Sequence, residues 1–289
     1  MNDGVLLGIY EKALVSADSW KDFFPQVAEG GFSFTDLSVD ETPERAARLD
    51  WDARTRRECR EAARDAGVTI GGICLSLHRK VMPGSVDPQV RAQALDVYRR
   101  GIRLASDLGV SVVQVAGYFA HYEPDDPQAR QRYVDTLMAA VPLAAREGVV
   151  LAIENVDGHD IASIPDAMAV IDEVNSPWVQ CYPDVGNIAE HGGDATTELR
   201  AGEGHMVALH VKDVLPGQPR RIPFGEGVAD FDAAFAELAR QKWSGRMMLE
   251  MWNDDHPDSV ATCIRAREFI ETKLSAAGLA VAESGSHQQ

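Results

Sequence analysis

Four short apolar runs in the second half of the sequence each end in a side chain that can bind a metal ion or move a proton. The last residues of these runs are Glu154, Asp184, His210 and Glu250. They are 30, 26 and 40 residues apart, which is about the length of one strand–helix–strand repeat. Metal-binding side chains at the carboxyl ends of successive parallel strands are typical of the catalytic end of a β/α barrel.

The rest of the sequence predicts the remaining units of such a barrel. Apolar segments that we expect to be buried strands alternate with segments that begin and end with helix signals, such as a capping Ser163 and a terminating Gly109. The expected strands are 5–10, 32–39, 68–76, 110–116, 149–154, 178–184, 206–210 and 246–251. The expected helices are 20–29, 51–66, 88–108, 126–147, one beginning after Ser163, 194–201, 231–241 and 258–276.

Strict alternation of strands and helices implies parallel strands, and eight repeats imply closure into a barrel. The strands are apolar at nearly every position, as in strands that are buried on both faces. The sequence contains no linker and no low-complexity block. It therefore predicts an α/β protein, a single-domain (β/α)8 TIM barrel over residues 1–289, with a mobile tail at 277–289.

Composition narrows the class of protein further. Apolar residues make up 45% and charged residues 25% of the chain, as in globular proteins with a large core. No apolar run approaches the roughly 20 residues that cross a bilayer, and the N-terminus lacks the basic region of a signal peptide. Four scattered cysteines without C-x-x-C spacing suggest reduced packing residues. We expect a cytoplasmic protein with no membrane partner.

Net charge bears on the kind of ligand. The chain has 28 basic and 45 acidic residues, a formal charge of −17. Such a surface repels polyphosphate, so nucleic-acid binding is disfavoured. A small anionic substrate stays compatible with this charge, because a local cluster of cations or a metal can invert the field inside one cleft.

The strand-end residues together suit a metal site. Three carboxylates and one imidazole are suitable ligands for one divalent ion, Mn²⁺, Mg²⁺, Co²⁺ or Zn²⁺. Any single strand-end carboxylate has another explanation, since it can cap the next helix or pair with a lysine. The occurrence of all four in phase, at consecutive strand ends, favours the metal site over that alternative.

Five further residues are candidate substrate ligands. Lys212 lies on the same side of its strand as His210 and could hold an oxyanion or pair with a ligand carboxylate; a solvated rim lysine is the less favoured alternative. Asn187 lies about one turn after Asp184, where its amide could reach a hydroxyl or simply form a turn. Ser76 ends the third expected strand, and His78 and Arg79 come just after it. They form a phosphate-binding loop or a solvated basic loop.

Two further segments lie near other strand ends. Lys12 ends the first strand and could reach the same ligand. The segment 223–227 contains a G-x-G pattern where barrels often bind phosphate, but the same pattern is common in turns. Serine-nucleophile, Walker and dinucleotide-binding motifs are missing from the sequence.

The sequence also resembles a known family. The shared segments include G-I-Y-E-K-A at 8–13 and S-V-D-E-T at 38–42. The others are 48–51, 74–76, 78–79, 182–184, 210–213, 223–228 and 249–252. On these segments the chain resembles the L-ribulose-5-phosphate 3-epimerases, also called L-xylulose-5-phosphate 3-epimerases, of the xylose-isomerase-like barrel superfamily. The similarity runs over nearly the whole chain.

The resemblance implies an isomerase that acts on a sugar phosphate and needs one divalent metal ion. Glu154 and Glu250 would be the acid/base pair and also metal ligands, with Asp184 and His210 completing the metal site. Related ketose 3-epimerases that act on unphosphorylated sugars have a histidine three residues after the metal Asp. Asn187 occupies that position here, which fits the phosphate-sugar branch and weakens a zinc-dependent DNA-repair endonuclease alternative. Barrels of this superfamily are often dimers or tetramers.

Chemistry explains why an epimerase would need this set of groups. Inversion at C3 of a ketose passes through an enediolate, which a divalent metal stabilises, while one carboxylate removes the proton and a second returns one to the other face. An aldose–ketose isomerase acting on a related sugar or hydroxy-keto acid uses the same intermediate and stays open as an alternative. A non-catalytic sugar-phosphate sensor is the alternative from another class.

Overall fold

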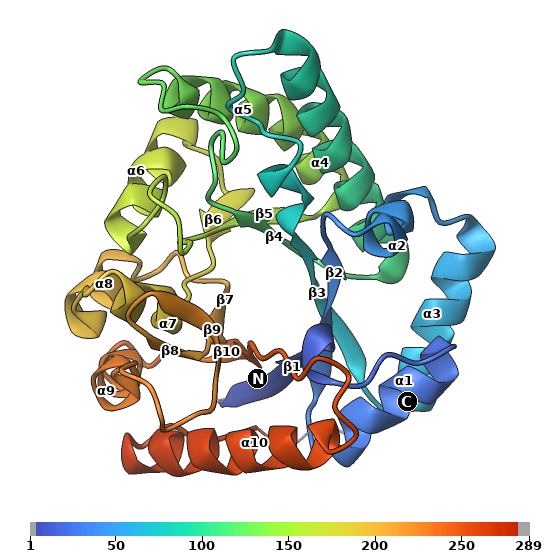
Figure 1. Ribbon diagram of the computed structural model, residues 1–289, viewed down its shortest axis with the longest axis vertical. Helices are drawn as coiled ribbons and strands as arrows, with labels where there is room; N and C mark the ends of the chain where they lie inside the picture. Colours follow the sequence, from blue (N-terminus) through green and yellow to red (C-terminus); the bar gives the residue numbers. More distant parts are fainter. Residues whose placement is uncertain (1–3, 283–289) are drawn as a thin grey trace.

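The computed structural model describes residues 4–282, and these residues form the predicted barrel. Within this range, eight parallel strands make one sheet in the order β6-β5-β4-β3-β2-β1-β10-β7. Figure 1 looks along the barrel and shows the strands as an inner ring with the helices outside it. The expected single-domain (β/α)8 fold is confirmed.

Each barrel strand coincides with one of the expected strands to within a few residues. The barrel strands are β1 (Val5–Tyr10), β2 (Phe34–Val39), β3 (Thr69–Leu75), β4 (Val112–Ala116), β5 (Val150–Glu154), β6 (Val179–Cys181), β7 (Ala208–Val211) and β10 (Gly245–Leu249). Their side chains are buried at nearly every position. This follows from the architecture, because one strand face packs inside the barrel and the other packs against the helices.

The outer helices also match the sequence signals. They are α1 (Trp20–Glu29), α3 (Ala53–Asp65), α4 (Pro88–Leu108), α5 (Ala129–Glu147), α6 (Ile164–Val174), α8 (Ala195–Ala201), α9 (Phe231–Arg240) and α10 (Ser259–Ala276). Ser163 caps α6 by accepting a hydrogen bond from the Asp166 N–H. Gly109 ends α4 in the left-handed region with a φ of 75°.

Three further elements lie beyond the expected alternation. A short helix α2 (Pro43–Ala46) follows β2, and a short helix α7 (Val185–Glu190) follows β6. An antiparallel hairpin of β8 (Asp213–Leu215) and β9 (Gln218–Ile222) begins two residues after β7. These elements follow the carboxyl ends of strands, so they enlarge the end of the barrel at which the candidate site lies.

The barrel closes between β6 and β7 through isolated bridges instead of a continuous ladder. Cys181 pairs with Met206, and Asp184 pairs with His210. The His210 N–H donates to the Pro183 carbonyl at 2.8 Å. This closure brings two of the expected metal ligands next to each other.

The last described residues lie against β1. The Val5 N–H donates to the Ala280 carbonyl at 2.8 Å, and the Ala282 N–H donates to the Val5 carbonyl at 2.9 Å. The sequence predicted a mobile tail at 277–289. Its first part, 277–282, includes residues that are hydrogen-bonded to the barrel, and 283–289 lie outside the described residues. None of the helices within 4–282 combines the length and the apolar character that a bilayer crossing requires.

Candidate active site

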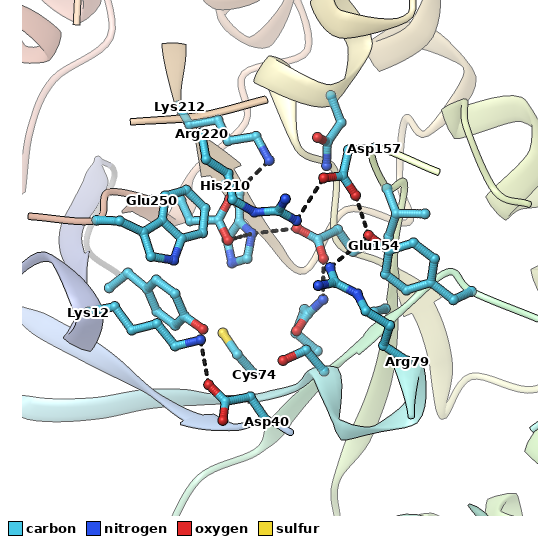
Figure 2. A pocket seen from close by; sticks show the side chains of 18 of the residues that line it. Lys12, Asp40, Cys74, Arg79, Glu154, Asp157, His210, Lys212, Arg220 and Glu250 are labelled. Atoms are coloured by element: carbon cyan, nitrogen blue, oxygen red, sulfur yellow. Dashed lines mark hydrogen bonds and ion pairs between the residues drawn. The ribbon is translucent and has the colours of Figure 1, made fainter. Parts of the chain in front are cut away.

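A cavity of about 220 Å³ opens at the carboxyl ends of the barrel strands. Side chains from strands on all sides of the barrel point into it, as Figure 2 shows. The lining residues are Tyr10, Lys12, Asp40, Glu41, Thr42, Cys74, Ser76, Arg79, Gln114, Ala116, Tyr118, Glu154, Val156, Asp157, Asn187, His210, Lys212, Arg220, Glu250 and Trp252.

The four strand-end residues form one cluster at the base of this cavity. Glu154 is the last residue of β5 and His210 lies in β7. Glu250 directly follows β10, and Asp184 lies three residues after β6, where it caps α7. One potential ligand atom from each lies within 4.8 Å of the others. The sequence placed these residues at successive strand ends, and barrel closure brings their side chains together.

Charged contacts hold the cluster in place. Oε1 of Glu154 lies 2.7 Å from Nδ1 of His210, and Oε1 of Glu250 lies 4.0 Å from the same nitrogen. The ammonium of Lys212 lies 2.8 Å from Oδ2 of Asp184 and 3.2 Å from Oε2 of Glu250. Lys212 is 4% exposed, and its ammonium contacts both carboxylates at the edge of the cavity that it lines.

The proximity of these groups shifts their pKa values. Burial raises the pKa of Asp184 to about 7, with Glu250 and Glu154 adding to the rise and Lys212 opposing it. Burial would lower the pKa of His210, but the carboxylates of Glu154, Glu250 and Asp184 together outweigh burial and raise that pKa to about 9. Burial would raise the pKa of Glu250, yet Lys212 and His210 lower it. The three carboxylates of the cluster thus carry more negative charge than the cations His210 and Lys212 compensate.

This cluster fits a divalent metal ion. Within residues 4–282, Oδ2 of Asp184 and Oε2 of Glu250 are buried and lack a hydrogen-bond partner, although Lys212 is close to both oxygens, and Nδ1 of His210 faces the same cluster. Buried polar atoms are normally hydrogen-bonded or bound to an ion. Oxygen and imidazole donors match the ligand preferences of Mn²⁺, Mg²⁺, Co²⁺ and Zn²⁺.

Local backbone structure fixes the position of Asp184. Its Oδ1 accepts hydrogen bonds from the N–H groups of Gly186 at 2.7 Å and Asn187 at 3.2 Å, so it caps α7. Its own N–H donates to the Asn155 side chain at 2.8 Å. One carboxylate oxygen is therefore used by the fold, and the other faces the cluster.

Cationic side chains on three other elements also line the cavity. Lys12 pairs with Asp40 at 2.5 Å, and Arg79 donates to the Tyr118 hydroxyl at 2.9 Å. Arg220 reaches in from β9, where it lies 2.7 Å from Asp157. These cations give a strongly acidic protein a cavity that can accept an anionic group.

The structure separates the six candidate substrate ligands into two groups. Lys12, Ser76, Arg79, Asn187 and Lys212 line the cavity. His78 does not, because it is 1% exposed and points toward α4, where its Nε2 lies 3.0 Å from the Ala94 carbonyl oxygen.

His78 also packs on the Tyr98 ring, with a centroid distance of 4.0 Å. In the short 3-10 helix 76–79, the side chain two residues after Ser76 turns outward from the barrel. We therefore replace the expected substrate contact of His78 by a packing role.

The G-x-G segment at 223–227 serves the loop itself. Asp213, at the start of β8, accepts hydrogen bonds from the N–H groups of Gly225 at 2.8 Å, Gly227 at 3.0 Å and Ala229 at 3.2 Å. A side chain at Gly227 would collide with the Asp213 carboxylate. The glycines thus permit close approach to an internal carboxylate, and neither lines the cavity of about 220 Å³.

Three further residues of the cavity, Gln114, Asp157 and Arg220, are not predicted from the sequence. Gln114 donates a hydrogen bond to Oε2 of Glu154, and Asp157 joins Tyr118 to Arg220. The Gln114 position carried a usable signal, because a polar side chain in the middle of a buried strand needs a partner. Asp157 and Arg220 lie in connections with no periodic pattern.

Comparison with known proteins gives consistent results. The sequence model of the family described as "Xylose isomerase-like TIM barrel" matches residues 24–273. L-ribulose-5-phosphate 3-epimerase of Salmonella paratyphi C is 41% identical over 273 residues, which cover 94% of this chain and 96% of that protein. The Escherichia coli protein of the same name is 40% identical over 273 residues, with the same coverage.

Solved structures share the fold at low sequence identity. An L-ribulose 3-epimerase superposes with a TM-score of 0.80 at 19% identity, covering 94% of this chain and 95% of that chain. A D-allulose 3-epimerase from Methylomonas sp. superposes with a TM-score of 0.78 at 17% identity, covering 93% of this chain and 97% of that chain. At these identities the structures support the barrel fold alone.

Proposed function

Because the chain belongs to the xylose isomerase-like TIM barrel family and, within it, to the L-ribulose-5-phosphate 3-epimerases, we propose that it interconverts L-ribulose 5-phosphate and L-xylulose 5-phosphate. The chain is a carbohydrate epimerase, and the proposal concerns its substrate, its metal and its proton-transfer residues. The observation that carries it is the pair of glutamates, Glu154 and Glu250, that flank His210 at 2.7 Å and 4.0 Å.

The proposed metal site consists of Glu154, Asp184, His210 and Glu250. A divalent ion held by these four residues would supply Lewis-acid polarisation of the C2 carbonyl and of the adjacent C3 hydroxyl. We include Mn²⁺, Mg²⁺, Co²⁺ and Zn²⁺ as candidates, because the mixed oxygen and nitrogen donors suit all four.

The proposed proton transfers use the two glutamates on opposite sides of the sugar. One carboxylate removes the C3 proton, the substrate becomes an enediolate, and the other glutamate donates a proton to the opposite face of C3. The roles exchange when the reaction runs in reverse. Inversion requires two such groups, since a single base would return the proton to the face from which it came.

The surrounding side chains orient the two glutamates and favour the ionised form of Glu250. Gln114 donates a hydrogen bond to Oε2 of Glu154 and thereby orients that carboxylate. Lys212 lies 3.2 Å from Oε2 of Glu250 and lowers the pKa of Glu250, which favours the ionised, proton-accepting form. Glu154 is buried and the Glu250 side chain is only 11% exposed, which limits the access of bulk water to the enediolate.

The proposal assigns the phosphate group of the substrate to the cationic part of the cavity. Lys12, Ser76 and Arg79 line this part, at the ends of β1 and β3. Arg79 is held by Tyr118, so its guanidinium is positioned before the substrate arrives. Asn187 and Lys212 would contact sugar oxygens nearer the glutamates.

Hydrogen exchange at C3 tests this proposal. We expect wild-type protein with Mn²⁺ in D₂O to incorporate deuterium at C3 of L-xylulose 5-phosphate and to form L-ribulose 5-phosphate, both followed by NMR. Glu154→Gln and Glu250→Gln should each slow epimerisation by about 100-fold or more. Glu58→Gln, on exposed α3, is the control and should behave like wild type.

Two outcomes would contradict the proposal. Unaltered deuterium incorporation in both glutamine variants would remove the glutamates from the proton transfer. Migration of the carbonyl from C2 to C1 would instead indicate an aldose–ketose isomerase.

A further inference from the structure

A buried carboxylate outside the glutamate pair lies inside the barrel near His210. Asp36, in the middle of β2, is 1% exposed. The Tyr182 hydroxyl donates a hydrogen bond to its Oδ2 at 2.9 Å across the barrel. Its other oxygen, Oδ1, is buried without a hydrogen-bond partner within residues 4–282.

The barrel is shaped to accommodate this carboxylate. The β2–β3 ladder shifts register between Thr35 and Asp36, which is a bulge-like irregularity that redirects a side chain. The facing residues of β3 are Gly71 and Gly72. A Cβ at Gly71 would lie 2.6 Å from Oδ1 of Asp36, and a Cβ at Gly72 would lie 2.8 Å from Oδ2. An irregularity and two adjacent glycines thus make room for one costly buried charge.

His210 offers a partner for the free oxygen. A ring nitrogen of His210, a carboxylate oxygen of Asp36 and the sulfur of Cys74 lie within 4.8 Å of one another. Nδ1 of His210 is already in contact with Glu154 at 2.7 Å, whereas Nε2 is buried and lacks a partner in the described residues. Tyr182 contacts both groups, because its ring packs edge-on against the imidazole with a centroid distance of 4.4 Å.

We infer that Asp36 is a positioning residue for His210, whose Nε2–H it binds through Oδ1, either directly or through one water molecule. The inference rests on the proposed function, in which His210 is a metal ligand. A proton fixed on Nε2 leaves the lone pair of Nδ1 directed at the carboxylate cluster, which is the form of imidazole that binds a metal. Carboxylates that orient a metal-binding histidine in this way stabilise the site without touching the ion.

Metal affinity measures this role without turnover. We expect Asp36→Ala to weaken Mn²⁺ binding by about 10- to 100-fold in calorimetric titration of the full chain. Asp36→Asn keeps an acceptor oxygen on a side chain of similar shape and should lose less Mn²⁺ affinity. Tyr182→Phe removes the hydrogen bond that fixes Asp36 and should change affinity in the same direction by a smaller factor.

A matched control separates positioning from general damage to the barrel. Thr35 is adjacent to Asp36, is fully buried, and donates its hydroxyl to the Ile9 carbonyl at 2.7 Å. Thr35→Val should lower stability while leaving the Mn²⁺ dissociation constant unchanged. An equal loss of affinity in Thr35→Val and Asp36→Ala would overturn the inference.

The imidazole itself provides a second measurement. In ¹⁵N-histidine-labelled protein with Zn²⁺, the His210 signals should show a protonated Nε2 and a metal-bound Nδ1 in the wild type. Asp36→Ala should shift the Nε2 resonance or mix the two tautomers, and Asp36→Asn should restore the wild-type pattern in part. Unchanged His210 signals together with unchanged affinity would overturn the inference.

The same experiments distinguish this inference from the proposed function. If wild-type protein epimerises the substrate and Asp36→Ala binds metal normally, the role of Asp36 is wrong while the function stands. A titration with Co²⁺ adds one more outcome: two ions per chain, with thiolate-to-cobalt charge-transfer absorption from Cys74, would make Asp36 a direct ligand and overturn its positioning role. If the wild type binds no divalent ion, both proposals fail.

Discussion

Lys212 is the residue whose surroundings most constrain its role. Its ammonium is buried between Asp184 and Glu250, and their charges raise its pKa despite the opposing effect of burial. A Cβ at Gly186 would lie 2.7 Å from the Lys212 carbonyl oxygen, so the lysine packs closely under α7. Lys212 therefore balances the charge of the carboxylate cluster as well as facing the cavity.

Removing that charge should destabilise the protein. We expect Lys212→Met to reduce the free energy of unfolding by about 3–5 kcal/mol under chelating conditions, because two buried carboxylates lose their compensating cation. Saturating Mn²⁺ should reduce the difference in unfolding free energy between Lys212→Met and wild type, because a divalent ion compensates the same carboxylates. Urea unfolding with and without Mn²⁺ measures both effects.

The control for this prediction is Lys80→Met, because Lys80 is exposed and follows the 3-10 helix 76–79. That variant should unfold like wild type. A Lys212→Met protein as stable as wild type in chelator would show that Lys212 is not needed to balance the cluster.

His78 predicts a pH dependence of stability. Burial lowers its pKa from 6.5 to about 4 in the folded protein. The unfolded chain therefore binds a proton near pH 6.5 while the folded protein does not. The contribution of His78 to the free energy of unfolding is therefore fully present above pH 6.5. It decreases as the pH falls from 6.5 to 4, by a total of about 3 kcal/mol.

His78→Gln tests this dependence, because glutamine can donate to the Ala94 carbonyl but does not titrate. We expect the variant to lose less stability than wild type between pH 7 and pH 5 in urea unfolding. Its KM for the substrate should stay at the wild-type value, since His78 lies outside the cavity. A large rise in KM would restore the substrate contact that the sequence suggested.

At the scale of elements, Asp213 links the loop after the β8–β9 hairpin to the hairpin itself. The same hairpin carries Arg220 into the cavity, so the order of the loop and the position of Arg220 are coupled. Gly227→Ala should break this arrangement, because the added Cβ would collide with Asp213. We expect a roughly 10-fold loss in kcat/KM, about 1.4 kcal/mol, carried mainly by a higher KM.

Hydrogen exchange checks that this loss arises in the loop. Amides of 213–230 should exchange faster in Gly227→Ala, while those of β4 and β5 should be unaffected. The exposed glycine at 192, after α7, is the control, and Gly192→Ala should leave exchange at 213–230 unchanged. Wild-type kcat/KM in Gly227→Ala would contradict the coupling.

The same elements show which features a sequence can predict. Helix α4 was predicted to the residue, because Asp87, Pro88 and Gly109 mark its ends by side-chain capping and backbone geometry. Helix α7 is not predicted, because it has only six residues and the metal site already explains its cap, Asp184, in the sequence. The β8–β9 hairpin was missed because β9 is mostly solvent-facing and shows no apolar alternation.

The site follows the same division. Glu154, Asp184, His210 and Glu250 could be found because strand ends in a parallel barrel converge on one rim. Arg220 and Asp157 meet only through the conformations of two connections, which tertiary contacts decide. His78 was misplaced for a related reason, since a 3-10 turn after β3 rotates it toward α4.

At the scale of the whole molecule, the cluster of Glu154, Asp184, His210 and Glu250, which we propose to bind the metal, spans the weakest seam of the barrel. The other neighbouring strands are joined by ladders, but β6 and β7 meet through isolated bridges. Glu154 and Asp184 belong to the β5–β6 side of this seam, whereas His210 and Glu250 belong to the β7–β10 side. An ion bound by all four residues would join the two sides.

Metal removal should therefore act on folding as well as on activity. We expect chelation to lower the melting temperature, since an ion at 100 times its dissociation constant stabilises the folded state by about 2.7 kcal/mol. The loss of protection from hydrogen exchange should be greatest for amides at the seam, such as Cys181 and Val207, which bond across it at 3.0 Å and 3.1 Å. Amides of β2 and β3, on the far side of the barrel, are the internal reference. Uniform deprotection of all eight strands on chelation would show that the ion stabilises the barrel as a whole and that β6–β7 closure does not depend on it.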